Sequence, residues 1–319
     1  MSQEHDHGGN IDAAVAQYGG RRAEWLDLST GINLRPYPLP DIPAHFWHAL
    51  PDSAAQSALI DAARSFWDVP AGIGILPAPG VSVLIAVLPR LAARATVRIE
   101  PLTYNEHAAA FRAAYWSVRT GGQTLGQVVV NPNNPCGRLW TADEVMAAHR
   151  VLTIVDESFC DVCPEASLVA LAHRPGVVVL KGLGKFWGLA GIRLGFALAR
   201  PQTVVRLAEM LGPWAVSGPA QHIGAAALRN HDWAATTRTR LQADANRLDR
   251  LMAPVARGKP CGTSLFRLYD VGDAATLHDR LARHKIWTRV FPWSGSALRL
   301  GLPGTDADRT RLGKALKSG

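Results

Sequence analysis

The stretch Val128-Val129-Val130-Asn131-Pro132-Asn133-Asn134-Pro135-Cys136-Gly137 decides the fold, because a short run of valines leads directly into a turn rich in asparagine and proline. Similar β-rich runs recur at 152–155, 177–180 and 195–198. Between the first two runs, Thr141-Ala142-Asp143-Glu144 fits a capping box and predicts a helix over about 142–150. Short strands that alternate with helices predict an α/β fold with a mainly parallel sheet.

Sequence patterns outside this region predict an N-terminal arm and a C-terminal domain in addition to the sheet. The proline-rich residues 36–40 indicate an extended arm or linker. A helical pattern over 221–252 is followed by an α+β pattern, which ends in a helix from about Asp306. We therefore expect three parts: an N-terminal arm that contributes to the active site, a large domain, and connecting helices with a smaller α+β C-terminal domain. Their predicted bounds are 1–40, 41–220 and 221–319.

The composition is ordinary for a globular protein, with 48% hydrophobic and 19% charged residues in a chain of 319. Apolar runs such as Val81 to Leu88 are far shorter than the ~20 residues that cross a bilayer. The N-terminus carries no readable secretory signal. We therefore expect a cytoplasmic protein with no membrane partner.

The formal net charge of +8 is spread along the chain rather than gathered in a dense Lys/Arg run. No nucleic-acid-binding motif accompanies it, so we expect no nucleic-acid partner. A small phosphorylated substrate is the favoured anionic partner.

The cysteines and N-terminal histidines predict no metal site. The four cysteines are too few and too scattered for a disulfide framework. Cys160-Asp161-Val162-Cys163 has the spacing of a zinc knuckle, but the chain has no second CxxC or CxxH pair to complete four ligands. His5 and His7 on the N-terminal tail are weak evidence for a metal.

Polar residues follow three of the predicted strands. Asn134 lies in the turn after the first run, Asp156 follows the second, and Lys185 follows the third. Each alone has a structural explanation, as a turn, a helix cap or a solvated loop residue. Because functional residues gather at the carboxyl ends of parallel strands, the three together predict a site.

These residues carry a family resemblance. Asn-Pro-x-Asn-Pro-x-Gly, an Asp at a strand end, and the segment from Lys185 to Gly195, Lys-Phe-Trp-Gly-Leu-Ala-Gly-Ile-Arg-Leu-Gly, resemble the class I/II aminotransferases, which are fold-type I pyridoxal 5′-phosphate (PLP) enzymes. The resemblance implies PLP as cofactor and Lys185 as the catalytic lysine that holds it. It also implies that Asp156 keeps the pyridine nitrogen protonated and that Asn134 donates to the phenolic oxygen of the ring.

The resemblance further implies a cradle for the cofactor phosphate. Gly80, Val81 and Ser82 precede a helical run and would supply backbone N–H groups, with Arg193 as the cation. Tyr104 stands where the family has an aromatic that stacks on the ring, although an ordinary core tyrosine explains it as well.

Two positions depart from the family pattern. The serine that commonly binds the phosphate, three residues before the lysine, is replaced by Gly182. The tyrosine whose hydroxyl often reaches the ring oxygen is replaced by Phe159. We expect weaker but retained PLP affinity. A nucleotide phosphate loop is excluded at 182–185, because the glycine spacing is wrong and Phe186 follows the lysine.

The N-terminus indicates the reaction. His7-Gly8-Gly9-Asn10 and the later segment from Trp25 to Asn33 resemble the opening of the L-threonine-O-3-phosphate decarboxylases of cobalamin biosynthesis. Histidinol-phosphate aminotransferases share the later motifs but generally lack His-Gly-Gly-Asn.

This resemblance implies decarboxylation to (R)-1-amino-2-propanol O-2-phosphate. It also implies substrate contacts from His7 and Asn33, and binding of phosphate and carboxylate by Arg289 and Arg299, without deciding which arginine binds which group. A homodimer that completes each active site is implied as well. The alternatives are a histidinol-phosphate-type aminotransferase and a non-catalytic PLP-fold binding protein.

Overall fold

The computed structural model describes residues 7–318, so His5 lies outside the described residues. The chain forms two compact units. Unit 1 comprises Met1–Arg35, Pro135–Gly137 and Thr236–Gly319, and unit 2 comprises Pro36–Asn134 and Arg138–Ala235. The three-part division at residues 40 and 220 remains a prediction.

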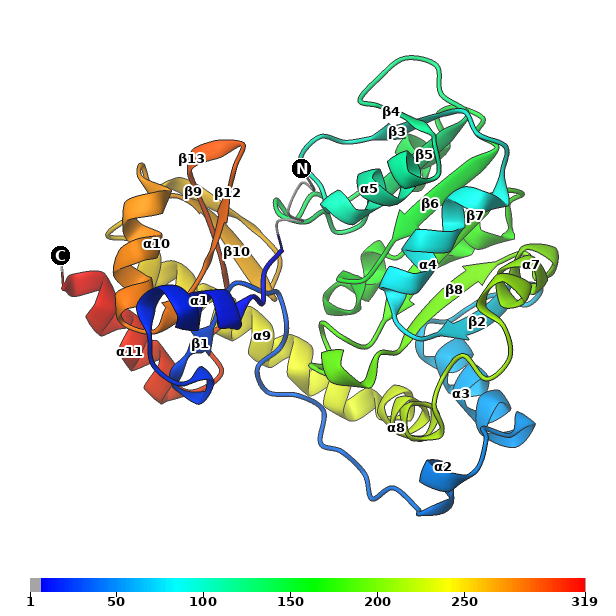
Figure 1. Ribbon diagram of the computed structural model, residues 1–319, viewed down its shortest axis with the longest axis horizontal. Coiled ribbons are helices and arrows are strands. Elements are labelled where there is room, and N and C mark those ends of the chain that lie inside the picture. The colour runs from blue at the N-terminus through cyan, green and yellow to red at the C-terminus, as the bar shows by residue number, and fades with distance from the viewer. Residues whose placement is uncertain (1–6, 319) are drawn as a thin grey trace. The chain divides into compact units, whose positions relative to one another are not determined.

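Unit 2 contains, within residues 7–318, a seven-stranded sheet with the order β2-β8-β7-β6-β5-β3-β4 (Figure 1). Its strands are β2 (Gly74–Ala78), β3 (Thr96–Ile99), β4 (Ser117–Arg119), β5 (Gly126–Val130), β6 (Leu152–Asp156), β7 (Val177–Gly182) and β8 (Gly195–Ala199). Strand β8 is antiparallel to both of its neighbours, and the other pairs are parallel. The continuous apolar runs of β5 to β8 are buried, as expected for strands covered on both faces. The mainly parallel α/β prediction is confirmed.

Several helices of unit 2 contact this sheet directly. The helices of the unit are α2 (His45–His48), α3 (Ser53–Phe66), α4 (Val81–Val87), α5 (Asn105–Ala113), α6 (Ala142–Met146), α7 (Pro201–Leu211) and α8 (Gly218–Arg229). Short 3₁₀ turns complete the unit: η2 (Leu88–Leu91), η3 (Cys160–Val162), η4 (Pro164–Ala166), η5 (Val169–His173) and η6 (Ala190–Ile192). Helix α4 contacts β2, β7 and β8. It buries Leu84 and Ile85 in the same apolar core as Val97 and Val178 of the sheet.

The capping box at the start of α6 is present, but the helix is shorter than predicted. Thr141 and Glu144 exchange the two expected hydrogen bonds, at 3.2 Å and 2.8 Å. The helix ends at Met146 rather than near residue 150, because the chain must turn into β6 and the backbone N–H of Val151 already donates to the carbonyl of Leu125 at 2.8 Å. Sheet pairing therefore overrides the local helical pattern.

The helical pattern over 221–252 corresponds to two helices. Helix α8 ends at Arg229, and α9 (His231–Met252) begins after Asn230. The side-chain oxygen of Asn230 accepts a hydrogen bond from the backbone of Trp233 at 3.0 Å, which is the geometry of a helix cap. No helix within residues 7–318 combines the length and the apolar character needed to cross a membrane.

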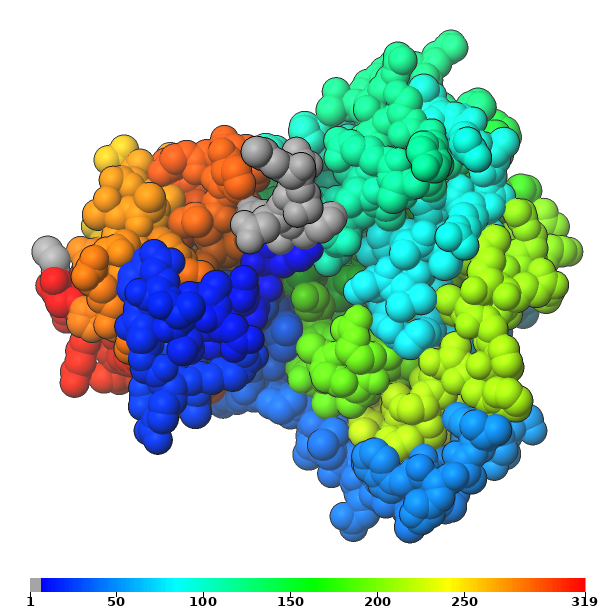
Figure 2. Space-filling model, viewed as in Figure 1, coloured from blue at the N-terminus to red at the C-terminus, as the bar shows by residue number. Residues whose placement is uncertain are grey.

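Unit 1 is an α+β assembly. In the described part of the chain it has an antiparallel sheet ordered β12-β13-β10-β9 and a parallel pair β1-β11. The strands are β1 (Leu26–Asp27), β9 (Arg257–Gly262), β10 (Phe266–Asp270), β11 (Ile286–Trp287), β12 (Arg289–Phe291) and β13 (Ser294–Gly301). The helices, besides most of α9, are α1 (Ile11–Tyr18), the 3₁₀ turn η1 (Arg22–Glu24), α10 (Ala274–Arg283) and α11 (Asp306–Lys317). The N-terminal segment with α1 lies against α10 (Figure 2), where Ile11, Ala14, Trp25 and Ala282 form a small apolar core.

Candidate active site

Asp156 is a buried carboxylate at the end of β6, with only 2% of its surface exposed. Its Oδ2 lies 2.8 Å from Nε2 of His107, which must be the donor because a carboxylate only accepts. Its Oδ1 accepts from the backbone N–H and the hydroxyl of Ser158, at 2.9 Å and 2.6 Å. Burial alone would raise the pKa of Asp156, but the hydrogen bonds from His107 and Ser158 outweigh burial and hold it below its usual range. The side chain is therefore an ionised acceptor, suited to keep a proton on a ring nitrogen.

Lys185 lies three residues beyond the end of β7, the strand that pairs in parallel with β6. The loop around it is closed by hydrogen bonds from Leu183 to Leu194 and from Leu189 to Leu183, each 3.1 Å. The Lys185 Nζ lies 5.5 Å from the ring centroid of Phe159, the residue that replaces the family tyrosine. Asp156 and Lys185 thus follow neighbouring parallel strands at the same edge of the sheet.

Trp187 anchors the lysine loop to the segment that follows Asp156. Its indole N–H donates to one oxygen of Asp161 at 2.9 Å, and the indole of Trp67 donates to the other oxygen at the same distance. Trp187 also stacks on Trp233, with ring planes 13° apart. These buried contacts limit how far the loop that carries Lys185 can move.

Gly80, Ser82 and Arg193 meet at the start of α4. The φ angle of Gly80 is +92°, a conformation that glycine adopts without strain and other residues rarely adopt, and a Cβ there would come within 2.6 Å of Arg193 Nη2. The same Nη2 lies 3.4 Å from the hydroxyl of Ser82. Val81 is the first residue of α4, where backbone N–H groups have no partner inside the helix. A guanidinium, a hydroxyl and backbone donors around a glycine fit a phosphate group.

Tyr104 and Asn134 lie on segments that are tied to the ends of β5 and β6. The backbone N–H of Asn131 donates to the carbonyl of Asp156 at 2.8 Å. Asn133 accepts from Thr103 at 2.6 Å, which joins the Asn-Pro turn to the segment of Tyr104. Asn134 is half-buried in this turn.

The Tyr104 ring faces the edge of His107, with the centroids 6.1 Å apart. Burial raises the pKa of Tyr104 to about 12, with smaller contributions from Glu106 and Asp156. The eight residues predicted to bind the cofactor therefore all lie in unit 2, and their roles remain predictions.

The sequence did not single out several partners of Asp156. No local sequence pattern links His107 to Asp156, because the two residues lie 49 positions apart along the chain. Ser158 could have been found from the pattern Asp-x-Ser, in which the serine side chain and N–H bond back to the carboxylate.

Glu157 has a structural role that differs from that of its neighbour Asp156. It forms a buried ion pair with Lys181, with 2.5 Å between Oε2 and Nζ, and also accepts from Ser167 at 2.7 Å. Burial alone would lower the pKa of Lys181, but Glu157 beside it raises the pKa above its usual value. Removing one partner of such a pair typically costs about 3–5 kcal/mol, so we expect this pair to be needed for folding.

The cysteines with zinc-knuckle spacing lie in and just after η3. Cys160 is buried, with its sulfur 3.6 Å from the carbonyl oxygen of Cys163. Among residues 7–318, no three side chains of His, Cys, Asp or Glu gather in a way that could hold a metal ion.

The arginines predicted to bind substrate lie opposite each other in unit 1. Arg289 of β12 pairs in register with Arg299 of β13. The side chain of Arg299 is buried, and its guanidinium donates to the carbonyl oxygen of Ser29 at 2.5 Å. Burial, helped by the charge of Arg289, lowers the pKa of Arg299 to about 10, while Asp27 opposes this shift. Two neighbouring guanidinium groups of which one is buried are a suitable site for anions.

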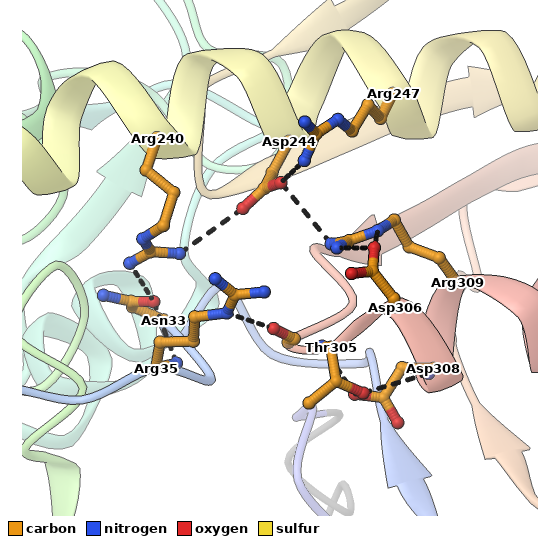
Figure 3. Close-up of polar contacts among 10 residues, drawn as sticks. Asn33, Arg35, Arg240, Asp244, Arg247, Thr305, Asp306, Asp308 and Arg309 are labelled. Carbon is orange, nitrogen blue, oxygen red and sulfur yellow. Dashed lines mark hydrogen bonds and ion pairs between the residues drawn. The ribbon is translucent and has the colours of Figure 1, made fainter.

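His7 and Asn33 lie on the N-terminal segments of unit 1. The exposed His7 is followed by two glycines, and the backbone N–H of Gly9 donates to the hydroxyl of Ser29 at 2.7 Å. A Cβ on Gly8 would come within 2.3 Å of the Ser29 carbonyl oxygen, so the glycine allows this close approach. The side chain of Asn33 is buried and accepts a hydrogen bond from Arg240 at 3.1 Å (Figure 3). Ser29 and Arg240 were not singled out from the sequence, because their contacts join segments far apart in the chain.

Known proteins resemble this chain over most of its length. The family model described as aminotransferase class I and II matches residues 47–316. A threonine-phosphate decarboxylase from Pseudomonas aeruginosa is 40% identical over 98% of this chain and 97% of its own length. A second protein of that name, from Sinorhizobium sp., is 39% identical over 99% of this chain and 98% of its own.

Solved structures share the fold. The histidinol-phosphate aminotransferase from Sinorhizobium meliloti in complex with pyridoxal-5′-phosphate superposes with a TM-score of 0.80 at 21% identity, covering 96% of this chain and 92% of that one. The L-threonine-O-3-phosphate decarboxylase from Porphyromonas gingivalis gives 0.71 at 19% identity, with 92% and 98% covered. The chain therefore belongs to the aminotransferase class I and II family, and within that family to the threonine-phosphate decarboxylases.

Proposed function

We propose that this protein is a PLP-dependent carboxy-lyase that converts L-threonine O-3-phosphate into (R)-1-amino-2-propanol O-2-phosphate and CO₂ in cobalamin biosynthesis. The observation that carries the proposal is the similarity to relatives named threonine-phosphate decarboxylase over nearly the whole chain, at 40% identity. The second relative of that name covers 99% of the chain, so its similarity extends into the N-terminal segment from His7 to Asn33, which precedes the region matched by the broader family.

The chemistry of the substrate matches the charged groups of unit 1. L-threonine O-3-phosphate carries two anions, a carboxylate and a phosphate. Arg289 and Arg299 offer two guanidinium groups on neighbouring strands, and His7 and Asn33 offer further donors. An arginine that holds the carboxylate also fixes the orientation of the bond from that group to Cα, which decides the reaction that follows.

The residues of unit 2 fit PLP. Arg193, Ser82 and the backbone from Gly80 would hold its phosphate, and Tyr104 would stack on its ring. Gly182 adds no hydroxyl to the phosphate site, in contrast to the serine of many family members. When bound, the cofactor supplies an electron sink for the pair of electrons left on Cα when CO₂ departs.

The protein's own residues then direct the reaction. Asp156, ionised and held by His107 and Ser158, would keep a proton on the pyridine nitrogen of the bound cofactor. Lys185 would hold the cofactor through its aldehyde, and its amine, or a water, would supply the proton that Cα takes up in place of CO₂. One C–C bond breaks and one C–H bond forms, so no oxidant or second substrate is needed.

A histidinol-phosphate-type aminotransferase is the second candidate. Relatives of that name match part of the chain, for example one from Aeromonas hydrophila that is 41% identical over 31% of this chain and 29% of its own length. Such an enzyme would break the Cα–H bond instead of the bond to the carboxylate and would need a keto acid as second substrate. A non-catalytic binding protein is the third candidate, and Lys185 argues against it.

The proposal includes the homodimer and the cytoplasmic location expected from the sequence. Light scattering on the purified protein tests the dimer, and fractionation of cells tests the location. A monomer that is fully active would contradict the completion of each site by a partner subunit.

CO₂ release tests the reaction. PLP-loaded protein is given L-threonine O-3-phosphate, and a parallel reaction measures transamination of histidinol phosphate with 2-oxoglutarate. We expect CO₂ release that disappears in Lys185→Ala. Transamination without CO₂ would overturn the decarboxylase assignment. No visible absorbance with PLP, and no attachment to Lys185 after borohydride treatment, would overturn both enzyme assignments.

A further inference from the structure

The Asn33 carboxamide is held in one orientation by Arg240, a residue of α9 that belongs to none of the sequence motifs (Figure 3). Only 3% of the surface of Asn33 is exposed. Its Oδ1 accepts from Arg240 Nη2 at 3.1 Å and from the backbone N–H of Arg35 at 3.0 Å. Both partners are donors only, so the oxygen of the carboxamide, and not its nitrogen, must face them.

This orientation has a chemical consequence for substrate binding. Phosphate and carboxylate groups are acceptors, so Asn33 can bind them only through the hydrogens of Nδ2. A flipped carboxamide would present oxygen to an anion and would repel it. We infer that Arg240 is a positioning residue that keeps Asn33 oriented as a hydrogen-bond donor toward the anionic substrate. The inference rests on the proposed function, because it assumes that Asn33 contacts that substrate.

Arg240 is itself fixed by a buried carboxylate one turn further along α9. Asp244 lies 3.4 Å from Arg240, 3.1 Å from Arg247 and 3.4 Å from Arg309 of α11 (Figure 3). Burial lowers the pKa of Arg240, and the charge of Asp244 opposes this shift. Among the arginines paired with Asp244 in the described part of the chain, Arg240 is the one bonded to Asn33.

Arg247 supplies a matched control. It lies on the same helix and shares Asp244, but no hydrogen bond joins it to Asn33 in the described structure. Its side chain is 51% exposed, compared with 23% for Arg240. Loss of either arginine removes one cation from Asp244, whereas only loss of Arg240 removes a donor from Asn33.

The expected effect is a change in substrate binding rather than in the chemical step. Arg240→Met removes the guanidinium that donates to Asn33 Oδ1, so the orientation of the carboxamide is less firmly held. We expect KM for L-threonine O-3-phosphate to rise about tenfold, as for one hydrogen bond to a charged group, with kcat changed less than about threefold. Arg240→Lys keeps a donor and should recover part of the loss. Arg247→Met should leave KM within about twofold.

A double-mutant cycle on the PLP-loaded enzyme tests whether Arg240 acts through Asn33. The cycle uses Asn33→Ala, Arg240→Met and the double variant, with thermal unfolding measured for each. We expect Arg240→Met to raise KM about tenfold in the wild type, but less than about twofold once Asn33 is alanine. An equal rise in both backgrounds, or no rise in either, would overturn the inference. If Arg240→Met does not fold, Arg240→Lys takes its place in the cycle.

Failure of the proposed function can be distinguished from failure of this inference. Absence of CO₂ release in the wild type overturns the decarboxylase, and the same cycle is then measured on the dissociation constant of L-threonine O-3-phosphate by calorimetry. Changes in binding free energy that are not additive in the double variant would support the role of Arg240. Additive changes would overturn it.

Discussion

Asp156 in unit 2 and Asp27 in unit 1 occupy the same local turn in different surroundings. Each ends a strand with a parallel partner, and each is followed two residues later by a serine, Ser158 or Ser29. In both turns the serine N–H and hydroxyl bond to Oδ1 of the aspartate, at 2.9 Å and 2.6 Å. The local sequence Asp-x-Ser therefore forms the same turn in both units.

The two turns differ in the contacts made by the rest of the chain. Asp156 is buried, and its second carboxylate oxygen accepts from His107, which holds the pKa of the carboxylate low. Asp27 is half-buried, and its charge acts on Arg299, while Ser29 accepts from the backbone of the His7 segment. On the proposed function, the turn in unit 2 would support an ionised group for the cofactor, and the turn in unit 1 would position residues for the substrate. The following predictions test this difference.

The largest expected effect follows removal of the Asp156 charge. In Asp156→Asn the amide cannot keep a proton on the pyridine nitrogen, so we expect kcat for CO₂ release to fall by about 10³. Steady-state kinetics of PLP-loaded protein measures this. Asp27→Asn is the matched control, and its kcat should change by less than about tenfold. Similar losses in both variants would contradict the distinct role of Asp156.

The next effect concerns His107 and acid stability. The pKa of Asp156 is lower in the folded protein than its unfolded value of about 3.9, so its contribution to stability is present above that pH and is lost as pH falls through the folded pKa. His107→Leu removes the main cause of the low pKa. We expect a loss of about 1.5–3 kcal/mol at neutral pH and unfolding that begins at higher pH during acid titration. Circular dichroism against pH measures this, and an unchanged acid transition would argue against the prediction.

A smaller effect is expected when Asp27 is removed. Asp27→Ala removes the acceptor of the two hydrogen bonds that Ser29 donates. Ser29 in turn accepts hydrogen bonds from Gly9 of the His7 segment and from Arg299. We expect KM for L-threonine O-3-phosphate to rise about tenfold, with kcat within about threefold, as for a loss of about 1.4 kcal/mol. A fall in kcat without a change in KM would show that the turn serves the chemical step instead.

The smallest effects are expected when the serine of either turn, Ser158 or Ser29, is replaced. Ser158→Ala and Ser29→Ala each remove a hydroxyl that bonds to aspartate, so each should cost about 1 kcal/mol of unfolding free energy. Only Ser29→Ala should raise KM, by about threefold, because its hydroxyl also holds Gly9. Denaturant unfolding and steady-state kinetics on the pair measure both quantities. A higher KM in Ser158→Ala, with an unchanged KM in Ser29→Ala, would contradict the assignment of substrate binding to the turn in unit 1.

Much of the fold follows from local sequence. The runs of β-branched and apolar residues predict β5, β6 and β7, and the capping box at Thr141 predicts the start of α6. The end of α6 and the break at Asn230 could not be predicted with the same success, because pairing of Val151 with Leu125 and capping by Asn230 compete with a continuing helical pattern. Propensity acts over a few residues, whereas these contacts depend on where the chain returns.

In the candidate site too, some features follow from the local sequence and others only from the tertiary structure. The chain order of Asn134, Asp156 and Lys185 predicts that they follow strands of one sheet, since the carboxyl ends of parallel strands share an edge. By itself, the sequence determined the α/β class, the family motifs and the turn at each Asp-x-Ser. Only the tertiary structure decided that His107 bonds to Asp156, that Arg299 is buried beside Ser29, and that Arg240 orients Asn33. Each of these contacts joins positions at least 49 residues apart. No local pattern specifies such partners, because burial and hydrogen bonding between distant segments are settled only when the whole core packs.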